Sequence, residues 1–206
     1  MNYLGNNHGG LVEINGKWYI FYHRHTNRHR NSRQMCAEQV KIAADGSIAQ
    51  AELTSCGLNG GPLKGRGRYE ARIACNLSSA QGTFIYPKEK AAPGIHPCFT
   101  QEGEDREDRP DQYIANLQDG AWAGFKYFDF QESGRITVSV RGNGAGKLLV
   151  ATERDAAPAA EIPLRPSPEW HEETAQFHVP TGVHALYFTY RGTGAVDWQW
   201  FELASL

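Results

Sequence analysis

The sequence predicts an all-β protein, with a short β-meander followed by an antiparallel β-sandwich or jelly roll. Three observations lead to this prediction. The chain contains five Trp, nine Tyr and nine Phe, and aromatic residues are enriched in strands. Its 22 Gly and ten Pro suit tight turns between short strands. No stretch keeps the apolar period of a helix over several turns.

The first segment, residues 8–54, predicts about four strands in meander order. Asn15-Gly16 stands between two β-rich runs and is a strong hairpin signal, because both turn positions need positive φ. The polar stretch 24–33 predicts an exposed loop. A second hairpin, turning at Asp45-Gly46, is predicted for residues 34–50.

A Gly-rich segment, residues 57–68, predicts a linker between one domain at 1–56 and a second at 69–206. Strand candidates then recur at the spacing of a sandwich, with turn residues between them. They are 69–76, 83–86, 112–117, 121–130, 135–141, 146–152, 173–179, 183–190 and 196–203. Residues 101–112 are densely charged and predict a solvated loop.

Composition and charge exclude several classes of protein. The formal net charge of −2 offers no basic surface for nucleic acid, and no apolar run approaches the length of a membrane helix. Residues 1–5 lack the charged and apolar regions of a signal peptide, and the sequence leaves the compartment open. The four cysteines form no C-x-x-C pair, so free buried thiols are expected, with a Cys36–Cys56 or Cys75–Cys98 disulfide as the alternative.

Residues 3–56 carry a series of short motifs. They are Asn7-His8-Gly9-Gly10, Glu13-Ile14-Asn15-Gly16-Lys17-Trp18-Tyr19-Ile20-Phe21-Tyr22-His23-Arg24, Arg33-Gln34, Asp45-Gly46-Ser47-Ile48 and Glu52-Leu53-Thr54-Ser55. In order and spacing they resemble the last blade of family 43 glycoside hydrolases, five-bladed β-propellers that act on arabinose- and xylose-containing polysaccharides. The resemblance implies that the catalytic carboxylates belong to earlier blades, so we expect no catalytic residue here. It also implies that His8 and Arg33 are relics of a propeller pocket.

Residues 69–206 resemble a family 6 carbohydrate-binding module. The matching motifs are Asp119-Gly120-Ala121-Trp122-Ala123-Gly124-Phe125, Ile136-Thr137-Val138-Ser139-Val140-Arg141-Gly142, Thr181-Gly182-Val183-His184-Ala185-Leu186-Tyr187-Phe188 and Val196-Asp197-Trp198-Gln199-Trp200-Phe201-Glu202-Leu203. The resemblance implies a sandwich that binds an oligo- or polysaccharide. Such a site needs a flat aromatic face for the sugar ring and side chains that hydrogen-bond its hydroxyls.

The resemblance also implies which residues form that site. Trp170, in a charged stretch near Pro168, matches the loop tryptophan that stacks on sugar. Asn116 or Leu117 stands where the family commonly carries an aromatic residue, and Ala195 stands where an asparagine often binds the sugar. Tyr113 and Tyr127 are substitute platforms, with core positions as the alternative. The predicted carbohydrate-binding residues are therefore Trp170, Tyr113, Asn116 and Tyr127.

Three further tryptophans lie in predicted strands. We expect Trp122 in the core. Trp198 and Trp200 are two residues apart, so they should share one face, either buried together or exposed together.

No cofactor is expected. His23, His25 and His29 have no spacing that demands zinc. The family often carries a structural calcium, but Cys75 falls near the carboxylate position and suits a hard cation poorly. Calcium is therefore not favoured, and Glu70, Asp197 and Glu202 are the remaining ligand candidates.

The leading hypothesis is a non-catalytic carbohydrate-binding protein or fragment related to arabinan- and xylan-degrading hydrolases. One alternative is a fragment or subunit of an active family 43 glycosidase completed by another chain. A second is an interaction module that has lost sugar binding. A bare blade would expose its apolar side chains, which predicts docking of residues 8–54 on the sandwich or a homodimer. The side chains concerned are Val12, Ile14, Trp18, Ile20 and Tyr22.

Overall fold

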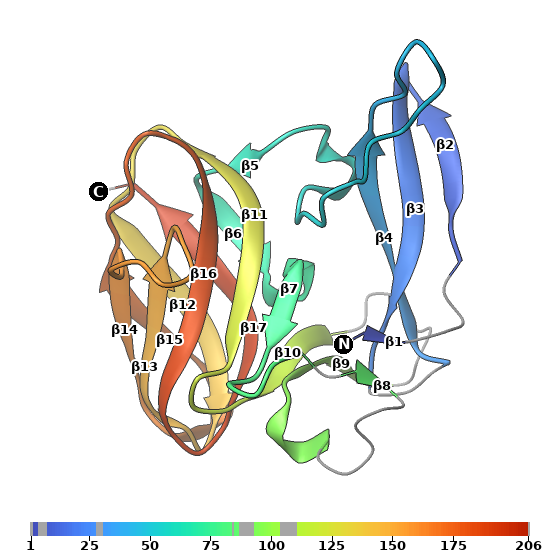
Figure 1. Ribbon diagram of the computed structural model, residues 1–206. Coiled ribbons are helices and arrows are strands. Elements are labelled where there is room, and N and C mark those ends of the chain that lie inside the picture. Colours follow the sequence, from blue (N-terminus) through green and yellow to red (C-terminus); the bar gives the residue numbers. More distant parts are fainter. Residues whose placement is uncertain are drawn as a thin grey trace.

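The computed structural model describes residues 2–3, 8–27, 31–83, 85–86, 93–103 and 111–205. Within these ranges the chain consists mainly of strands, with three short 3-10 helices, which confirms the predicted all-β class. A β-sandwich and a separate three-stranded sheet lie side by side (Figure 1). No helix in the described ranges is long and apolar enough to cross a membrane.

The separate sheet, here called the hairpin sheet, has the strand order β2-β3-β4. Its strands are β2 (Gly10–Ile14), β3 (Lys17–His25) and β4 (Arg33–Val40). Asn15 and Gly16 form the β2–β3 turn with positive φ angles of 52° and 75°, as Asn-Gly predicts. The predicted second hairpin is reduced to its turn at Asp45-Gly46, because β4 ends at Val40 and no strand follows it in the described residues 41–56, on the other side of the turn. Only Ile42 and Ile48 bridge around the turn at Asp45.

The loop between β3 and β4 is shorter than the predicted 24–33. Strand β3 continues through His25, and β4 begins at Arg33. The side chains of His25, Thr26 and Ser32 are buried, so this end of the hairpin sheet is not the exposed polar loop that the sequence predicted.

The sandwich contains two sheets. In the first, here called the β12 sheet, the order is β15-β12-β17-β10-β9, and β6 also pairs with β17. Its strands are β6 (Gly67–Glu70), β9 (Cys98–Glu102), β10 (Asp111–Leu117), β12 (Arg135–Gly142), β15 (Ser167–Gln176) and β17 (Val196–Ala204). In the second, here called the β16 sheet, the order is β14-β13-β16-β11-β5, and β7 also pairs with β11. Its strands are β5 (Leu63–Lys64), β7 (Asn76–Ser78), β11 (Trp122–Phe130), β13 (Ala145–Ala151), β14 (Ala160–Leu164) and β16 (Gly182–Thr193).

The remaining elements are short. They are β1 (Asn2–Tyr3), which pairs in parallel with β8 (Ile85–Tyr86), and the 3-10 helices η1 (Gly57–Asn59), η2 (Ala71–Ile73) and η3 (Pro93–Ile95). Part of the predicted 57–68 linker belongs to the sandwich, since β5 pairs with β11 and β6 with β17. Most of the charged segment 101–112 lies outside the described residues.

The core lies between the two sheets and is centred on packed aromatic rings. Phe188 and Trp198 have ring centroids 4.6 Å apart, and Phe125 and Phe201 lie 4.9 Å apart. All four side chains are essentially inaccessible to solvent. Burying each one stabilises the fold by about 2–3 kcal/mol, so this cluster fixes how the two sheets sit on each other.

Trp198 and Trp200 do not share one environment, so that prediction is wrong. Trp198 is fully buried, whereas Trp200 is half-buried with the guanidinium carbon of Arg68 3.7 Å from its ring centre. The register between β12 and β17 shifts here, and Gln199 is the extra residue. A bulge of this kind moves the residues beyond it to the other face of the strand.

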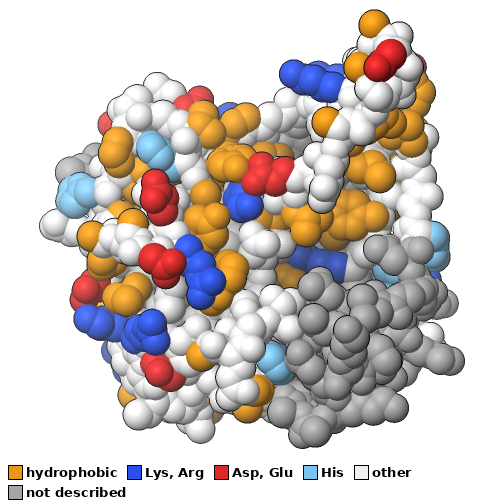
Figure 2. All heavy atoms as spheres, viewed as in Figure 1, with side chains coloured by type: hydrophobic (Ala, Val, Ile, Leu, Met, Phe, Trp, Pro, Cys, Tyr) orange, Lys and Arg blue, Asp and Glu red, His pale blue; other side chains and the backbone are white. Residues whose placement is uncertain are grey.

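The segment that follows β4 contacts the sandwich through polar groups, and the hairpin sheet leaves apolar side chains exposed. Glu52 forms an ion pair with Lys126 at 2.9 Å and accepts hydrogen bonds from the Tyr127 hydroxyl at 3.0 Å. A cavity of about 740 Å³, lined in part by Tyr22, lies between the two parts, and Figure 2 shows a hollow there. Residues 8–54 therefore contact the sandwich, but not by the predicted packing of their apolar side chains, because Val12 and Ile20 remain 44% and 38% exposed.

Candidate functional site

Trp170 lies in β15, the edge strand of the β12 sheet, and not in a loop as predicted. Its side chain is half-buried. The guanidinium carbon of Arg141 lies 4.4 Å from the centre of its ring, and the Tyr113 ring meets it edge to face at 5.4 Å. Trp170 is therefore a partly exposed aromatic surface held in place by two neighbouring side chains.

Arg141 joins four adjacent strands at this position. Its Nη2 donates to the Tyr113 hydroxyl on β10 at 3.0 Å, and its Nε donates to Asp197 Oδ2 on β17 at 3.3 Å. It also forms an ion pair with Glu102 on β9. Partial burial disfavours the charged guanidinium, but the hydrogen bonds to Glu102 and Asp197 and the neighbouring negative charges together outweigh it, so the pKa of Arg141 is raised. Burial, followed by the negative charge of Asp197, raises the pKa of Tyr113.

Asn116 lies beside this network at the end of β10. Its backbone N–H donates to Asp197 Oδ1 at 3.0 Å, and its φ of 64° is in the left-handed region that asparagine tolerates. Its side-chain amide donates to the carbonyl of Gly94 at 2.7 Å and to that of His96 at 3.2 Å. Asn116 therefore connects the η3 segment to the carboxylate that holds Arg141.

The structure brings three of the four predicted carbohydrate-binding residues together and separates the fourth. Tyr113, Asn116 and Trp170 are linked through Arg141 and Asp197. Tyr127 instead contacts Glu52 where the hairpin sheet meets the sandwich. Sequence reasoning missed Arg141, the residue at the centre of this network. Ile136, Val138 and Val140 alternate toward the core along β12, and this alternation could have shown that Arg141 points away from it.

A second aromatic surface lies on the other sheet. The Arg154 guanidinium carbon is 4.4 Å from the Trp122 ring centre, and the Tyr187 ring lies 6.1 Å from Trp122. Trp122 is half-buried, so its predicted place in the core is wrong. The β16 sheet that carries Trp122 and Tyr187 is the front layer of the sandwich in Figure 1.

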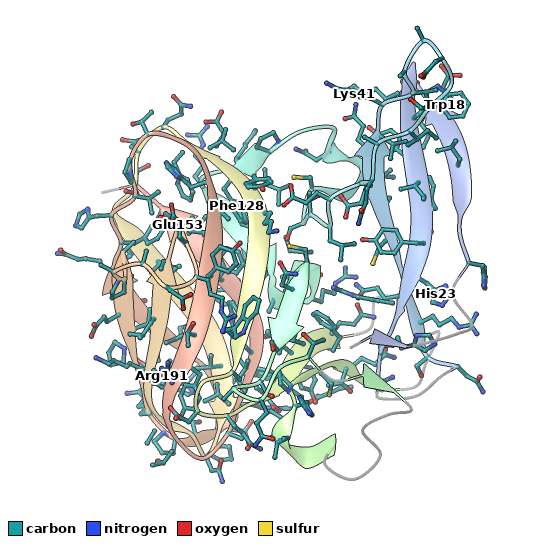
Figure 3. All side chains as sticks on the ribbon, viewed as in Figure 1. Trp18, His23, Lys41, Phe128, Glu153 and Arg191 are labelled. Carbon is teal, nitrogen blue, oxygen red and sulfur yellow. The ribbon has the colours of Figure 1, made fainter. Side chains whose placement is uncertain are left out.

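The two predicted propeller-pocket residues lie at one end of the hairpin sheet. The exposed His8 has its ring 5.0 Å from His23, near the end of β3, and Arg33 pairs in register with His25. Figure 3 shows His23 at this end, opposite the tip that carries Trp18. Within the described ranges, no group of three His, Cys, Asp or Glu residues suits a metal ion; His29 falls outside those ranges.

The three candidate calcium ligands form ion pairs. Each carboxylate is paired with a different arginine: Glu70 with Arg72, Asp197 with Arg141, and Glu202 with Arg68. The thiol of Cys75 donates to the Gly124 carbonyl at 3.3 Å, so this position offers no hard oxygen ligand. Cys75 and the other three cysteines are free thiols.

Comparison with known proteins places this arrangement in a family. The family described as carbohydrate binding module (family 6) matches residues 98–205, just over half of the chain. The chain belongs to this family. The match spans β9 to β17 and does not include the hairpin sheet. It contains the residues around Trp170 described above, namely Glu102, Tyr113, Arg141, Trp170 and Asp197.

The module is also similar to longer proteins. It is 47% identical to a xylosidase/arabinosidase of Thermoclostridium stercorarium, over 100% of this chain and 43% of that protein. It resembles a family 43 arabinoxylan arabinofuranohydrolase from Bacillus subtilis, crystallised with cellotetraose, with a TM-score of 0.64, 19% identity, and coverage of 98% of this chain and 41% of that chain.

A third similarity concerns an isolated module. CsCBM6-3 from Clostridium stercorarium, solved with cellobiose, matches with a TM-score of 0.54 and 14% identity, over 71% of this chain and 99% of that chain. Both structural matches establish the fold of the sandwich. The first match, which covers 98% of this chain, also includes the hairpin sheet. The chain spans less than half the length of the curated relatives it matches.

Proposed function

We propose that this chain is a non-catalytic module that binds plant-polysaccharide chains at Trp170. The observation that carries the proposal is the half-exposed Trp170 ring with Arg141 stacked against it and two carboxylates on the same guanidinium. A pyranose ring needs an aromatic surface for its apolar face and charged or polar groups for its hydroxyls, and this arrangement supplies both.

The neighbouring strands give the site rigidity. Trp170, Arg141, Asp197 and Tyr113 project from β15, β12, β17 and β10, which are consecutive neighbours in one sheet. Side chains that are fixed before binding lose little conformational entropy when the ligand arrives. In this proposal the sugar stacks on the accessible part of the Trp170 ring, and Arg141, Asp197 and Glu102 hydrogen-bond its hydroxyls.

The names of similar proteins suggest the class of ligand. The relatives are named for activity on xylose- and arabinose-containing substrates, a solved module of this fold contains cellobiose, and the similar family 43 hydrolase was crystallised with cellotetraose. We propose xylose- or glucose-containing chains as ligands, with arabinoxylan as the polymer of first choice.

The test compares the full-length wild-type chain with the variants Trp170→Ala and Trp122→Ala. Isothermal titration calorimetry with xylotetraose and cellotetraose, and affinity electrophoresis in arabinoxylan gels, would measure binding. Removing Trp170 should weaken binding at least about tenfold, because an aromatic face of this size contributes roughly 1.5–3 kcal/mol. The Trp122 variant, matched in chemistry but located on the other sheet, should bind within about twofold of wild type. None of the three proteins should release 4-nitrophenol from 4-nitrophenyl arabinofuranoside.

Two results would overturn this assignment. If Trp122→Ala lost binding and Trp170→Ala kept it, the ligand would bind on the β16 sheet. If the wild-type chain bound none of these carbohydrates, the chain would be an interaction module without a sugar site of this class.

A second candidate function concerns the hairpin sheet. Four of its apolar side chains are exposed, namely Leu11, Val12, Ile20 and Met35, and Met35 is 72% exposed. Leu11 and Ile20 pair in register, so they share one face of the hairpin sheet, whereas Val12 and Met35 lie on the other face. An exposed apolar pair such as Leu11 and Ile20 indicates a surface that contacts further polypeptide. We propose that a second copy of this chain, or the remainder of a related hydrolase, covers them.

Sedimentation velocity tests the homodimer directly. The double variant Leu11→Thr/Ile20→Thr should lose any concentration-dependent dimer that the wild type forms. Val183→Thr is the matched control, since Val183 is 53% exposed on the sandwich. A wild-type chain that stays monomeric at every concentration would exclude the homodimer, and co-purification with a larger chain would then favour completion by a hydrolase.

A further inference from the structure

We infer that Arg24 of the hairpin sheet is a positioning residue for the carbohydrate site, acting through strand β9 and Glu102 on the Arg141–Trp170 pair. The inference rests on the proposed function for its effect on binding. Its structural part, that Arg24 sets the environment of Trp170, can be tested without any ligand.

The first step is the anchoring of Arg24 in the sandwich. Its Nε donates to Gln34 Oε1 on β4 at 2.9 Å, and its two Nη atoms donate to the carbonyls of Arg72 and Ala74. Its guanidinium carbon lies 3.6 Å from the centre of the Phe99 ring on β9. Burial lowers the pKa of Arg24, so these hydrogen bonds and the stacking offset the loss of water around its charge.

The second step is a set of contacts between the end of β3 and the free edge of β9. The backbone N–H of Asn27 donates to the Phe99 carbonyl at 2.8 Å, and the Thr100 hydroxyl donates to Asn27 Oδ1 at 2.7 Å. Strand β9 is the last strand of the β12 sheet, with β10 on its other side. An edge strand has one unpaired side, and here the segment after β3 satisfies part of it.

The third step leads from β9 to the carbohydrate site. Thr100 pairs in register with Tyr113, and Glu102 pairs with Asp111. Glu102 forms the ion pair with Arg141, the residue that stacks on Trp170 and bonds the Tyr113 hydroxyl. Glu102 is three residues along the strand from Phe99, about 10 Å at the rise of a β-strand. A shift of β9 at Phe99 would therefore move the carboxylate that orients Arg141.

A side-chain route runs in parallel with the strand. Gln112 Oε1 accepts from Arg72 Nη1 at 3.0 Å, and Gln112 Nε2 donates to Gln101 Oε1 at 3.3 Å. The carbonyl of the same Arg72 accepts from Arg24. Both routes end on β9 next to Glu102, so the hairpin sheet supports one edge of the carbohydrate site although it lies outside the matched family range.

The ligand-free test uses two-dimensional NMR of the tryptophan indole N–H groups in the full-length chain. The Trp170 signal is identified by its loss in Trp170→Phe. Arg24→Gln should shift that signal, and the control Arg68→Gln should leave it in place. Arg68 is a matched control because it also stacks on an aromatic ring, Trp200, and pairs with a carboxylate, Glu202. An unmoved Trp170 signal in a folded Arg24→Gln protein would overturn the inference, whatever the wild type binds.

The binding test is a double-mutant cycle with xylotetraose or cellotetraose as the probe. Arg24→Gln and Glu102→Gln should each weaken binding about threefold to tenfold, and the double variant should bind no worse than Glu102→Gln, because residues in one network do not act additively. Additive losses, or wild-type affinity in Arg24→Gln, would overturn the coupling. If Arg24→Gln fails to fold, Thr100→Val takes its place in both tests. This variant removes the hydrogen bond from the Thr100 hydroxyl to the Asn27 side chain. Failure of the wild type to bind would instead contradict the proposed function and leave the NMR result standing.

Discussion

The Arg141 guanidinium carbon lies 4.4 Å from the centre of the Trp170 ring. This stacking covers part of an aromatic surface and also places a permanent positive charge beside it. A guanidinium is planar and weakly hydrated, so it stacks on a ring and still bonds carboxylates at its edge. The pair explains why an exposed tryptophan on an edge strand has a defined position.

Replacing Arg141 should weaken both the fold and the carbohydrate site. Arg141→Met would remove the hydrogen bond to Tyr113 and leave Glu102 and Asp197 without their shared cation. We expect a loss of about 1–2 kcal/mol in the free energy of unfolding, since the groups are partly exposed, and about tenfold weaker oligosaccharide binding. Urea unfolding and calorimetry measure the two effects. Arg141→Lys, which keeps the charge without the planar fork, should fall between wild type and Arg141→Met; equal values for all three proteins would contradict this role.

Trp198 and Trp200 should differ sharply when truncated. Trp198→Ala would empty a fully buried site and lose the indole bond to the Trp200 carbonyl, which is 2.9 Å long. We expect it to cost about 3–5 kcal/mol of stability, whereas Trp200→Ala, at a half-buried site under Arg68, should cost about 1 kcal/mol. Thermal and urea denaturation of the two variants compare them directly. Similar losses would mean that the β17 bulge does not separate their environments.

Glu38 should stabilise the segment that connects the hairpin sheet to the sandwich. This buried carboxylate accepts from the Tyr22 hydroxyl at 3.0 Å, and from the Thr54 backbone N–H at 2.8 Å and hydroxyl at 2.6 Å. Burial and then the nearby Glu38 charge raise the pKa of Tyr22. Glu38→Ala would leave these donors unsatisfied, at a cost of about 2–4 kcal/mol. Hydrogen exchange at Thr54 and urea unfolding report the loss, and Glu13→Ala, on the exposed part of the same sheet, is the control.

The Glu52 contact should make stability depend on acid pH. The hydrogen bond from Lys126, and secondarily that from Tyr127, lowers the pKa of Glu52 below its usual value of 4.5. A carboxyl group with a lowered folded-state pKa contributes stability above its unfolded pKa, and that contribution is lost as the pH falls through the folded pKa. The pair is half exposed, so the effect should stay below about 1 kcal/mol. Glu52→Gln should reduce the stability difference between pH 6 and about pH 3 in urea titrations; an unchanged pH profile would contradict this.

Local chemistry explains which elements could be predicted. Asn15-Gly16 specified its turn because few other residues adopt positive φ. β11 and β12, which have alternating or continuous apolar runs, were predicted within a residue or two of their bounds. The edge strand β15 was predicted six residues short, because its polar residues 167–172 show no apolar face. Strand β9, at the opposite edge of the same sheet, was missed for a related reason, since it merges into a charged segment.

The sequence alone determined the all-β class, the Asn-Gly hairpin and the resemblance to a family 6 carbohydrate-binding module, and it predicted Trp170 as a binding residue. These depend on short motifs, on alternation within one strand and on residue type, which are all local. Only the tertiary structure decided that Arg141 stands against Trp170, that Tyr127 belongs to a different contact, and that Arg24 reaches β9. Such contacts join residues on strands that are distant in sequence, and a single bulge or register shift between those strands changes which side chains meet.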